Sequence, residues 1–212
     1  MENKEKLDTP LWDLNNYAGG VYEPMEDSFL LLDTLEEELP LIRNLNPAII
    51  LEIGSGSGII ISSLAGACQN SFCMAIDINP TACLATENTA KLNGTSVNAI
   101  QGDLVNGLKL KNLIDVLVFN PPYVPSEDKA GNELIDKAWA GGVDGRATTN
   151  RLFPYLNDLM SEKSVGYLVA ISENNPLEMC TILENMGFKA DNIKSRRILG
   201  EYLSILRFTK GI

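Results

Sequence analysis

Short apolar runs along the chain alternate with segments of helical periodicity. Five of these runs have the length of a buried strand, and they lie at residues 48–53, 71–76, 97–101, 114–119 and 166–171. Segments with helical spacing or composition lie at residues 21–39, 59–68, 80–92, 148–160 and 176–186. Two final segments with strand character, 188–195 and 203–208, predict a hairpin. The alternation predicts an α/β fold with a doubly wound, mostly parallel sheet.

The first predicted helix covers residues 21–39. Leucines recur near helical spacing at positions 31, 32, 35 and 39, and Pro40 is expected to lie just past the end of the helix. Glu26, Asp27 and Ser28 stand in its first turns, where acidic side chains suit the positive end of the helix dipole. From local pattern alone, we interpret these three residues as capping residues rather than ligand contacts.

Polar side chains stand where four of the predicted strands end: Glu52, Asp77, Asp103 and Asn120. Because the carboxyl ends of parallel strands meet at one edge of a sheet, these side chains are expected to line a common rim. A nucleoside-type cofactor that lies across a doubly wound sheet requires such an arrangement. The coincidence of four strand ends carries more weight than any one of these residues.

The first strand leads into a glycine-rich turn at 54–58, in which Gly54 and Gly56 let a ligand approach the backbone. Asp77 follows at the spacing where dinucleotide-type folds place a carboxylate on the ribose hydroxyls. Asp103 is placed to accept from a purine amine, although an ordinary turn carboxylate explains it equally well. The glycine spacing differs from that of nicotinamide binders, and no Walker lysine follows, so phosphate cradling is poorly supported.

The segment Asn120-Pro121-Pro122-Tyr123 follows a strongly apolar run at 114–119 that predicts a buried central strand. The two prolines lack an amide hydrogen, so the strand must stop at Asn120 and the chain must continue in an extended form. The Asn120 side-chain oxygen and the Pro121 carbonyl can each accept a hydrogen from a flat NH2 group, while Tyr123 stacks on its plane. Pro-Pro pairs often only punctuate turns, so the catalytic interpretation depends on the rest of the chain.

After Tyr123 the chain is irregular as far as about Arg146, with several glycines and with Trp139 among small residues. A long loop inside a compact domain is usually functional or disordered. Because it adjoins the Asn-Pro-Pro-Tyr segment, we predict that this loop is a substrate-binding lid.

Composition limits the classes of protein that remain. The 212 residues, of which 45% are hydrophobic and 21% charged, are enough for one domain, expected at residues 21–212 after a polar amino-terminal extension at 1–20. No signal peptide or membrane span is predicted, and a soluble, cytoplasmic protein is expected, with a nuclear pool also compatible. The sequence has no histidine and four cysteines without a C-x-x-C pair, so no metal site is expected. The net charge of −11 disfavours broad binding to nucleic acid.

Taken together, the residues from Glu52 to Gly58, Asp77, Gly102-Asp103-Leu104 and Asn120 to Tyr123 resemble the class I S-adenosylmethionine-dependent methyltransferases that act on planar nitrogens. Further stretches resemble the HemK-like glutamine methyltransferases of eukaryotes and archaea. These stretches are Tyr22-Glu23-Pro24 with Glu26-Asp27-Ser28, Ala138-Trp139-Ala140-Gly141-Gly142 with Gly145-Arg146, and Glu173-Asn174-Asn175-Pro176. The resemblance runs from about Val21 to the carboxyl end.

The resemblance implies a Rossmann-like sheet of seven strands with the last one antiparallel, and S-adenosyl-L-methionine as cofactor. It implies as substrate the glutamine of the Gly-Gly-Gln motif in class 1 peptide-chain release factor, and as partner a small zinc-binding activator protein. The third strand, at 97–101, would lie at a sheet edge and invite such pairing. Cofactor contacts are implied for Ser28, Glu52, Gly54, Gly56, Asp77, Asp103, Leu104 and Asn120. The catalytic segment is Asn120, Pro121, Pro122 and Tyr123, of which Asn120, Pro121 and Tyr123 would hold the target amide.

Two other functions remain open at this point. The same Asn-Pro-Pro-Tyr segment would also hold the exocyclic amine of a nucleobase in DNA or RNA, although the acidic charge disfavours this substrate. A nucleotide-binding scaffold or a nicotinamide-dependent protein is a third interpretation, and the glycine spacing disfavours it.

Overall fold

A seven-stranded sheet is the centre of the computed structural model, which describes residues 6–17, 19–126 and 140–212. The strand order is β3-β2-β1-β4-β5-β7-β6. β1 to β5 run parallel, and β7 runs antiparallel to both β5 and β6. The predicted mostly parallel sheet with a terminal hairpin is therefore confirmed. The strands are β1 (Ile49–Ile53), β2 (Phe72–Asp77), β3 (Asn98–Gln101), β4 (Ile114–Phe119), β5 (Met160–Ile171), β6 (Lys189–Ile198) and β7 (Glu201–Lys210).

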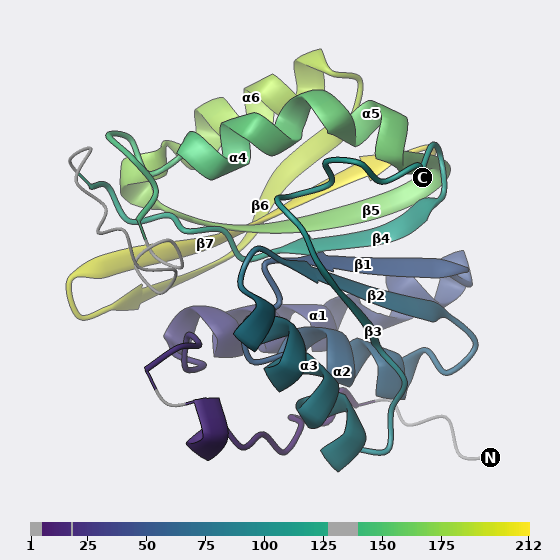
Figure 1. The fold of residues 1–212 in the computed structure, drawn as a ribbon. Helices are drawn as coiled ribbons and strands as arrows, with labels where there is room; N and C mark the ends of the chain where they lie inside the picture. Colours follow the sequence, from purple (N-terminus) through teal and green to yellow (C-terminus); the bar gives the residue numbers. More distant parts are fainter. Residues whose placement is uncertain (1–5, 18, 127–139) are drawn as a thin grey trace.

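Helices cover both faces of the sheet (Figure 1). One face carries α1 (Glu26–Leu45), α2 (Ile59–Ala67) and α3 (Pro80–Leu92), and the other carries α4 (Ala147–Leu152), α5 (Leu156–Leu159) and α6 (Pro176–Asn185). Three short 3-10 helices complete the described elements: η1 (Asn15–Tyr17), η3 (Phe153–Tyr155) and η4 (Ser172–Asn174).

The central strands have apolar side chains on both faces, which explains their continuous apolar runs. In β1, Ile50 belongs to the cluster beneath α1 and α2, while Leu51 belongs to the cluster beneath α4 to α6. In β4, Val118 and Phe119 divide between the same two clusters. The sheet thus lies between two hydrophobic layers, and this leaves its strand ends to carry polar residues.

The expected end of the first helix at Pro40 is wrong, because α1 continues through Pro40 to Leu45 and is closed by Asn46 in the left-handed conformation. A proline inside a helix costs about 3 kcal/mol, since it removes one hydrogen bond and its ring crowds the preceding turn. On either side of it, Leu39 and Ile42 are fully buried, and each such burial contributes about 1.5–3 kcal/mol. Packing against the sheet therefore outweighs the local penalty.

Other boundaries also differ from the prediction. The first helix, expected from residue 21, begins at Glu26. The helix expected at 148–160 is divided into α4, η3 and α5, because Pro154 lies at the start of the 3-10 turn. The strand expected at 166–171 begins six residues earlier, at Met160, where it pairs with Ile114 before an irregularity in the register. The longer β5 gives β7 a long partner for the terminal hairpin.

Residues 6–17, expected as part of a polar extension, pack against the domain. Leu7 is 3% exposed and joins the main core, and Leu14 packs with Val21 and with α3 residues. The Ser63 hydroxyl donates to the Asp8 carbonyl at 2.7 Å, and Leu11 exchanges two hydrogen bonds with Asn93. This segment therefore covers α2 and α3 rather than standing apart from them.

Ion pairs connect the terminal hairpin to the acidic face of α1. Arg196 contacts Asp33, Lys194 contacts Glu37 at 2.8 Å, and the Arg207 guanidinium contacts Glu38 at 3.0 Å. These pairs hold β6 and β7 against the middle part of α1. Figure 1 shows the hairpin on the same side of the molecule as α1.

No helix in the described ranges is long and apolar enough to cross a bilayer. Nor does any group of three or more histidine, cysteine or acidic residues in the same ranges form a metal site. All four cysteines are buried and free, and burial raises the pKa of the Cys73 thiol to about 12.

Candidate active site

A cavity of about 650 Å³ opens at the carboxyl ends of β1, β2 and β4. It lies where the strand order reverses between β1 and β4, the position at which open α/β sheets bind their ligands. Its volume is in the range typical of small-molecule sites. All the residues proposed from the sequence line it, namely Ser28, Glu52, Gly54, Gly56, Asp77, Asp103, Leu104, Asn120, Pro121, Pro122 and Tyr123.

The glycine turn and Asp77 form one wall of the cavity. The Gly56 amide donates to Asp77 Oδ2 at 2.9 Å, and the Asn79 amide donates to Oδ1 at 2.8 Å. Gly56 has a φ of 50° and nothing within 4 Å of an added Cβ, so this turn leaves open space for a ligand. Each carboxylate oxygen keeps a lone pair, so Asp77 can still accept from a pair of hydroxyls.

Glu52 is the most deeply buried acid of the cavity. Its Oε2 accepts from the Ile61 amide at 3.0 Å, near the start of α2. Burial raises the pKa of the Glu52 carboxyl well above its usual range, and the nearby charge of Asp77 adds to the rise. Burial likewise raises the pKa of Asp77, against the lowering effect of its backbone hydrogen bonds. Carboxyls with raised pKa values in a cavity make it a candidate functional site.

Asp103 lines the cavity and makes an ion pair that the sequence did not predict. Its Oδ2 contacts the Arg151 guanidinium at 2.5 Å, so one carboxylate oxygen is already paired at the mouth of the cavity. The adjacent Leu104 is buried and has a φ of 53°, a left-handed conformation that non-glycine residues rarely adopt. Arg151, which the sequence analysis did not single out, also lines the cavity.

Asn120 stands directly after β4 and has an incomplete set of hydrogen bonds. Its Nδ2 donates to Asp27 Oδ2 at 2.8 Å, while its Oδ1 is buried and has no partner among the described residues. A buried acceptor without a partner costs about 1–3 kcal/mol, so its persistence calls for an explanation. Here the hydrogen bond to Asp27 fixes which end of the carboxamide remains free. Asn120 therefore offers an acceptor to a bound N–H group.

The interpretation of Asp27 as a capping residue is wrong. The amino-terminal cap of α1 is Met25, which makes no side-chain capping bond, and Asp27 is 3% exposed on the cavity wall. Besides Asn120, its carboxylate accepts from the Ser28 amide at 2.7 Å and from the Tyr22 hydroxyl at 3.3 Å. Asp27 thus fixes the orientation of the Asn120 carboxamide.

Tyr22 and Tyr123 surround the same carboxylate. Burial and the charge of Asp27 raise the pKa of both phenols, so both remain neutral hydroxyls at physiological pH. Tyr123 is buried and lines the cavity. Its stacking on a substrate stays a prediction.

The tip of the β6–β7 hairpin supplies residues that sequence reasoning missed. Ile198, Leu199 and Glu201 line the cavity, and the Leu199 side chain is fully exposed at its mouth. Burial raises the pKa of the Glu201 carboxyl, and the charge of Asp27 adds to the rise. Nothing in the local sequence indicates this, because the hairpin reaches the cavity only through its pairing with β5 and α1.

The loop predicted to be a lid falls largely outside the described residues, since 127–139 with Trp139 are not among them. Its described ends lie beside Tyr123. Val124 bridges to Ala140, and the Gly141 amide donates to the Val124 carbonyl at 2.8 Å. Whether the loop acts as a lid stays a prediction.

Comparison with known proteins assigns the chain to a family. The profile described as "Methyltransferase small domain" matches residues 26–141. The human protein named "Methyltransferase HEMK2" is 43% identical over 195 residues, which cover 90% of this chain and 90% of that protein. The chain belongs to the HEMK2 family of methyltransferases.

Two further relatives of this HEMK2-family methyltransferase carry informative names. The fission yeast protein named "eRF1 methyltransferase catalytic subunit mtq2" is 37% identical over 203 residues and 88% of each chain. The solved E. cuniculi Mtq2–Trm112 complex, described as responsible for methylation of the eRF1 translation termination factor, contains a chain that is 30% identical. The alignment covers 90% of this chain and 99% of that one, with a TM-score of 0.71.

For a HEMK2-family methyltransferase, the cavity has two chemically different ends. The glycine turn, Glu52 and Asp77 form an end rich in acceptors for a polar cofactor. Asn120, Pro121 and Tyr123 form an end suited to a planar nitrogen, with Asp27 behind them. Methyl transfer requires a donor and an acceptor held in line, and the cavity can provide this at the boundary between the two ends.

Proposed function

We propose that this methyltransferase transfers a methyl group from S-adenosyl-L-methionine to the side-chain nitrogen of a glutamine. The target is the Gly-Gly-Gln motif of a class 1 peptide-chain release factor, and the product is N5-methylglutamine. The observation that carries the proposal is Asn120, a residue of the cavity wall whose Nδ2 is bound to Asp27 and whose buried Oδ1 lacks a partner within the described ranges. A primary amide supplies the hydrogens that this acceptor needs.

The cofactor end fits S-adenosylmethionine in its chemistry. Bound there, it supplies an electrophilic methyl group on a sulfonium sulfur. Asp77 would accept from the ribose hydroxyls, and Asp103 and Leu104 would hold the purine. Ser28, Glu52 and the open backbone at Gly54 and Gly56 would hold the remaining part.

At the acceptor end, Asn120 Oδ1 and the Pro121 carbonyl would accept the two amide hydrogens, while Tyr123 lies along the plane of the amide. An amide nitrogen is a weak nucleophile because its lone pair is delocalised. These acceptors favour the positive charge that grows on nitrogen as its bond to the methyl carbon forms and the carbon–sulfur bond breaks. Positioning and electrostatics then supply most of the rate without a dedicated base. The methylated nitrogen afterwards releases one of its two protons to water, and the second product is the uncharged thioether S-adenosylhomocysteine.

The names of the relatives support the choice of substrate. The fission yeast protein is named for methylation of eRF1, and the E. cuniculi complex is described by the same reaction. The two alignments cover 88% and 90% of this chain. The chain also carries the Asn-Pro-Pro-Tyr segment at the end of β4. A release-factor glutamine is therefore the acceptor that we assign to it.

The proposal is tested by incubating the enzyme with release factor and S-adenosylmethionine and mapping the product by mass spectrometry. One methyl group on the glutamine of the Gly-Gly-Gln motif is expected. The Asn120→Ala variant should still bind S-adenosylhomocysteine but lose about 100-fold in kcat, comparable to removing an oxyanion-hole donor. Methyl transfer to DNA or RNA instead, or full activity of Asn120→Ala, would contradict the proposal.

We also propose that a small activator protein of the zinc-binding type pairs with the free edge of β3. β3 is an edge strand with no fully buried residue, whereas the inner strand β1 is almost entirely buried. Such an edge invites pairing with another strand, or aggregation. The E. cuniculi relative was solved in complex with Trm112.

We expect poor solubility when the chain is expressed alone and a soluble heterodimer when it is expressed with the activator. Size-exclusion chromatography and specific activity measure both. A monodisperse, fully active monomer would show that the chain has no need of the partner.

A further inference from the structure

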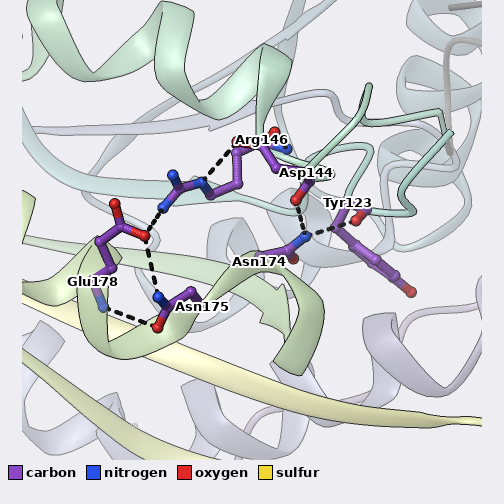
Figure 2. A network of polar contacts seen from close by, with 6 residues as sticks. All are labelled: Tyr123, Asp144, Arg146, Asn174, Asn175 and Glu178. Atoms are coloured by element: carbon purple, nitrogen blue, oxygen red, sulfur yellow. Dashed lines mark hydrogen bonds and ion pairs between the residues drawn. The ribbon is translucent and has the colours of Figure 1, made fainter. Parts of the chain in front are cut away.

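Asn174 lies outside the cavity lining but uses its whole side chain on main-chain groups near the catalytic segment. It ends η4, just after β5, and is 2% exposed. Its Oδ1 accepts from the Ile171 amide at 2.8 Å, and its Nδ2 donates to the Tyr123 carbonyl at 2.8 Å and to the Asp144 carbonyl at 3.1 Å. Figure 2 shows the side chain between these carbonyl groups. One carboxamide thus connects the segments that follow β4 and β5 with the loop before α4.

The Tyr123 carbonyl matters because the two residues before Tyr123 are prolines. Pro121 and Pro122 have no amide hydrogen and cannot be held through main-chain donors. Asn120 is anchored at one end of the segment by β4 and by Asp27. At the other end, the hydrogen bond from Asn174 holds the carbonyl of the last residue. The position of the Pro121 carbonyl, which lies between the two anchors, depends on both.

The packing around Asn174 leaves no room for adjustment. Gly145 has a φ of 69°, and a Cβ added there would overlap the Tyr123 carbonyl oxygen and the Asn174 Nδ2 atom. A Cβ at Gly141 would overlap the Gly145 backbone at 2.6 Å. The glycines of this loop therefore allow it to approach the catalytic segment and place the Asp144 carbonyl within reach of Asn174.

The charged residues of the same network lie farther out. Arg146 pairs with Asp144 at 3.3 Å and with Glu178 at 3.1 Å, and both of these acids are about half exposed. Pairs with exposed partners contribute little, about 0–1 kcal/mol. Asn175 is exposed, adopts a φ of 54°, and caps α6 through its side chain. The buried amide of Asn174 is therefore the part of this network that bears on the catalytic segment (Figure 2).

We propose that Asn174 is a positioning residue for methyl transfer, which holds the Tyr123 carbonyl and thereby sets the geometry with which Asn120 and Pro121 bind the target amide. This inference rests on the proposed function. It assigns a role to a side chain that touches neither the cofactor nor the substrate.

The test compares Asn174→Asp with Asn175→Asp in the enzyme in complex with its activator. The first variant keeps the acceptor for Ile171 but turns a carboxylate oxygen towards two carbonyl oxygens. The second makes the same chemical change at the exposed neighbour, where aspartate still caps the helix. We expect kcat of Asn174→Asp to fall about 10- to 100-fold at pH 8, as for a buried group left unpaired. The dissociation constant for S-adenosylhomocysteine should not change.

The pH dependence separates positioning from a general loss of structure. The carboxyl at position 174 is buried beside carbonyl oxygens, so its pKa is raised, and protonation restores a donor. Relative to wild type, kcat of Asn174→Asp should therefore recover as the pH is lowered, while Asn175→Asp follows wild type throughout. Amide hydrogen exchange at Asn120, Tyr123, Val124 and Ser126, the residues of this segment that carry an amide hydrogen, should be faster in Asn174→Asp alone.

Asn174→Asp with the kcat and exchange rates of wild type would overturn the inference, as would a fall in kcat that pH does not relieve. A wild-type enzyme that binds S-adenosylhomocysteine but does not methylate release factor would overturn the proposed function instead. In that case the exchange measurement still decides whether Asn174 holds the segment.

Discussion

Replacing Asp27 by asparagine tests whether the orientation of the Asn120 carboxamide controls the reaction. In the wild-type chain, Asp27 Oδ2 accepts from Asn120 Nδ2 at 2.8 Å, and Asp27 Oδ1 accepts from the Ser28 amide at 2.7 Å. An asparagine at position 27 keeps its oxygen on Ser28 and turns an NH2 group towards Asn120. Two donors then face each other, and the Asn120 carboxamide must reverse.

The reversal offers the target amide a donor where it needs an acceptor. The lost hydrogen bond to a charged group contributes about 1.5–3 kcal/mol. Loss of the Asn120 acceptor resembles the loss of an oxyanion-hole donor, which costs about 2.7–4 kcal/mol. Since the two effects act through one carboxamide and do not add fully, we expect kcat/KM for Asp27→Asn to fall about 100- to 1000-fold.

The assay is the initial rate of methyl transfer to release factor, with S-adenosylhomocysteine affinity measured by calorimetry as the control for folding. In the double variant Asp27→Asn with Asn120→Asp, the NH2 group at position 27 donates to one carboxylate oxygen at position 120. The other oxygen of that carboxylate remains free to accept from the target amide. It should recover at least about tenfold over Asp27→Asn, a coupling of ~1.4 kcal/mol. Wild-type rates in Asp27→Asn, or no recovery in the double variant, would refute this reasoning.

Three other changes test separate parts of the structure. Burial raises the pKa of Glu52, so the folded state binds its proton more tightly than the unfolded state, and the free energy of unfolding falls as pH rises above the ordinary carboxyl pKa of about 4.3. Glu52→Gln should therefore raise Tm at pH 8 but not near pH 4, and weaken cofactor binding; the same gain in Tm at both pH values would contradict this. Gly58→Ala should lower the free energy of unfolding by about 1–3 kcal/mol more than Gly94→Ala in urea denaturation. Both glycines have positive φ, but only at Gly58 would a Cβ meet the Thr86 backbone, at 2.5 Å, so equal losses would argue against the close approach of α2 and α3. Leu199→Asp at the exposed hairpin tip should raise KM for release factor about tenfold without changing cofactor affinity. Leu177→Asp, the same change at another exposed leucine, on α6, serves as its control, and an unchanged KM in Leu199→Asp would exclude the tip from substrate contact.

The sheet and the location of the cavity were predictable from sequence because of how parallel sheets are buried. Central strands are covered on both faces, which produces continuous apolar runs, and the polar residues that follow must collect at one edge. Glu52, Asp77 and Asn120 reached the cavity by this rule alone. The glycine turn was also predictable from the sequence, because a backbone that a ligand approaches closely requires residues without a Cβ.

The features that the sequence did not predict depend on contacts between residues far apart in the chain. The continuation of α1 through Pro40 depends on packing against the sheet, and local propensity cannot register such packing. The local sequence around Asp27 indicates a capping residue. Only the structure shows that Asp27 accepts a hydrogen bond from Asn120, 93 positions away. The pairing of Asp103 with Arg151 and the entry of the hairpin tip into the cavity are of the same kind. No local pattern indicates which distant side chain will meet a given acid.

A crystal structure of the enzyme with S-adenosylhomocysteine and a Gly-Gly-Gln peptide tests the central claim most directly. The account predicts the cofactor across the ends of β1, β2 and β4, with the glutamine amide between the sulfur and Asn120 and both of its hydrogens on Asn120 Oδ1 and the Pro121 carbonyl. A sulfur atom turned away from Asn120, or a glutamine held by other residues, would contradict it.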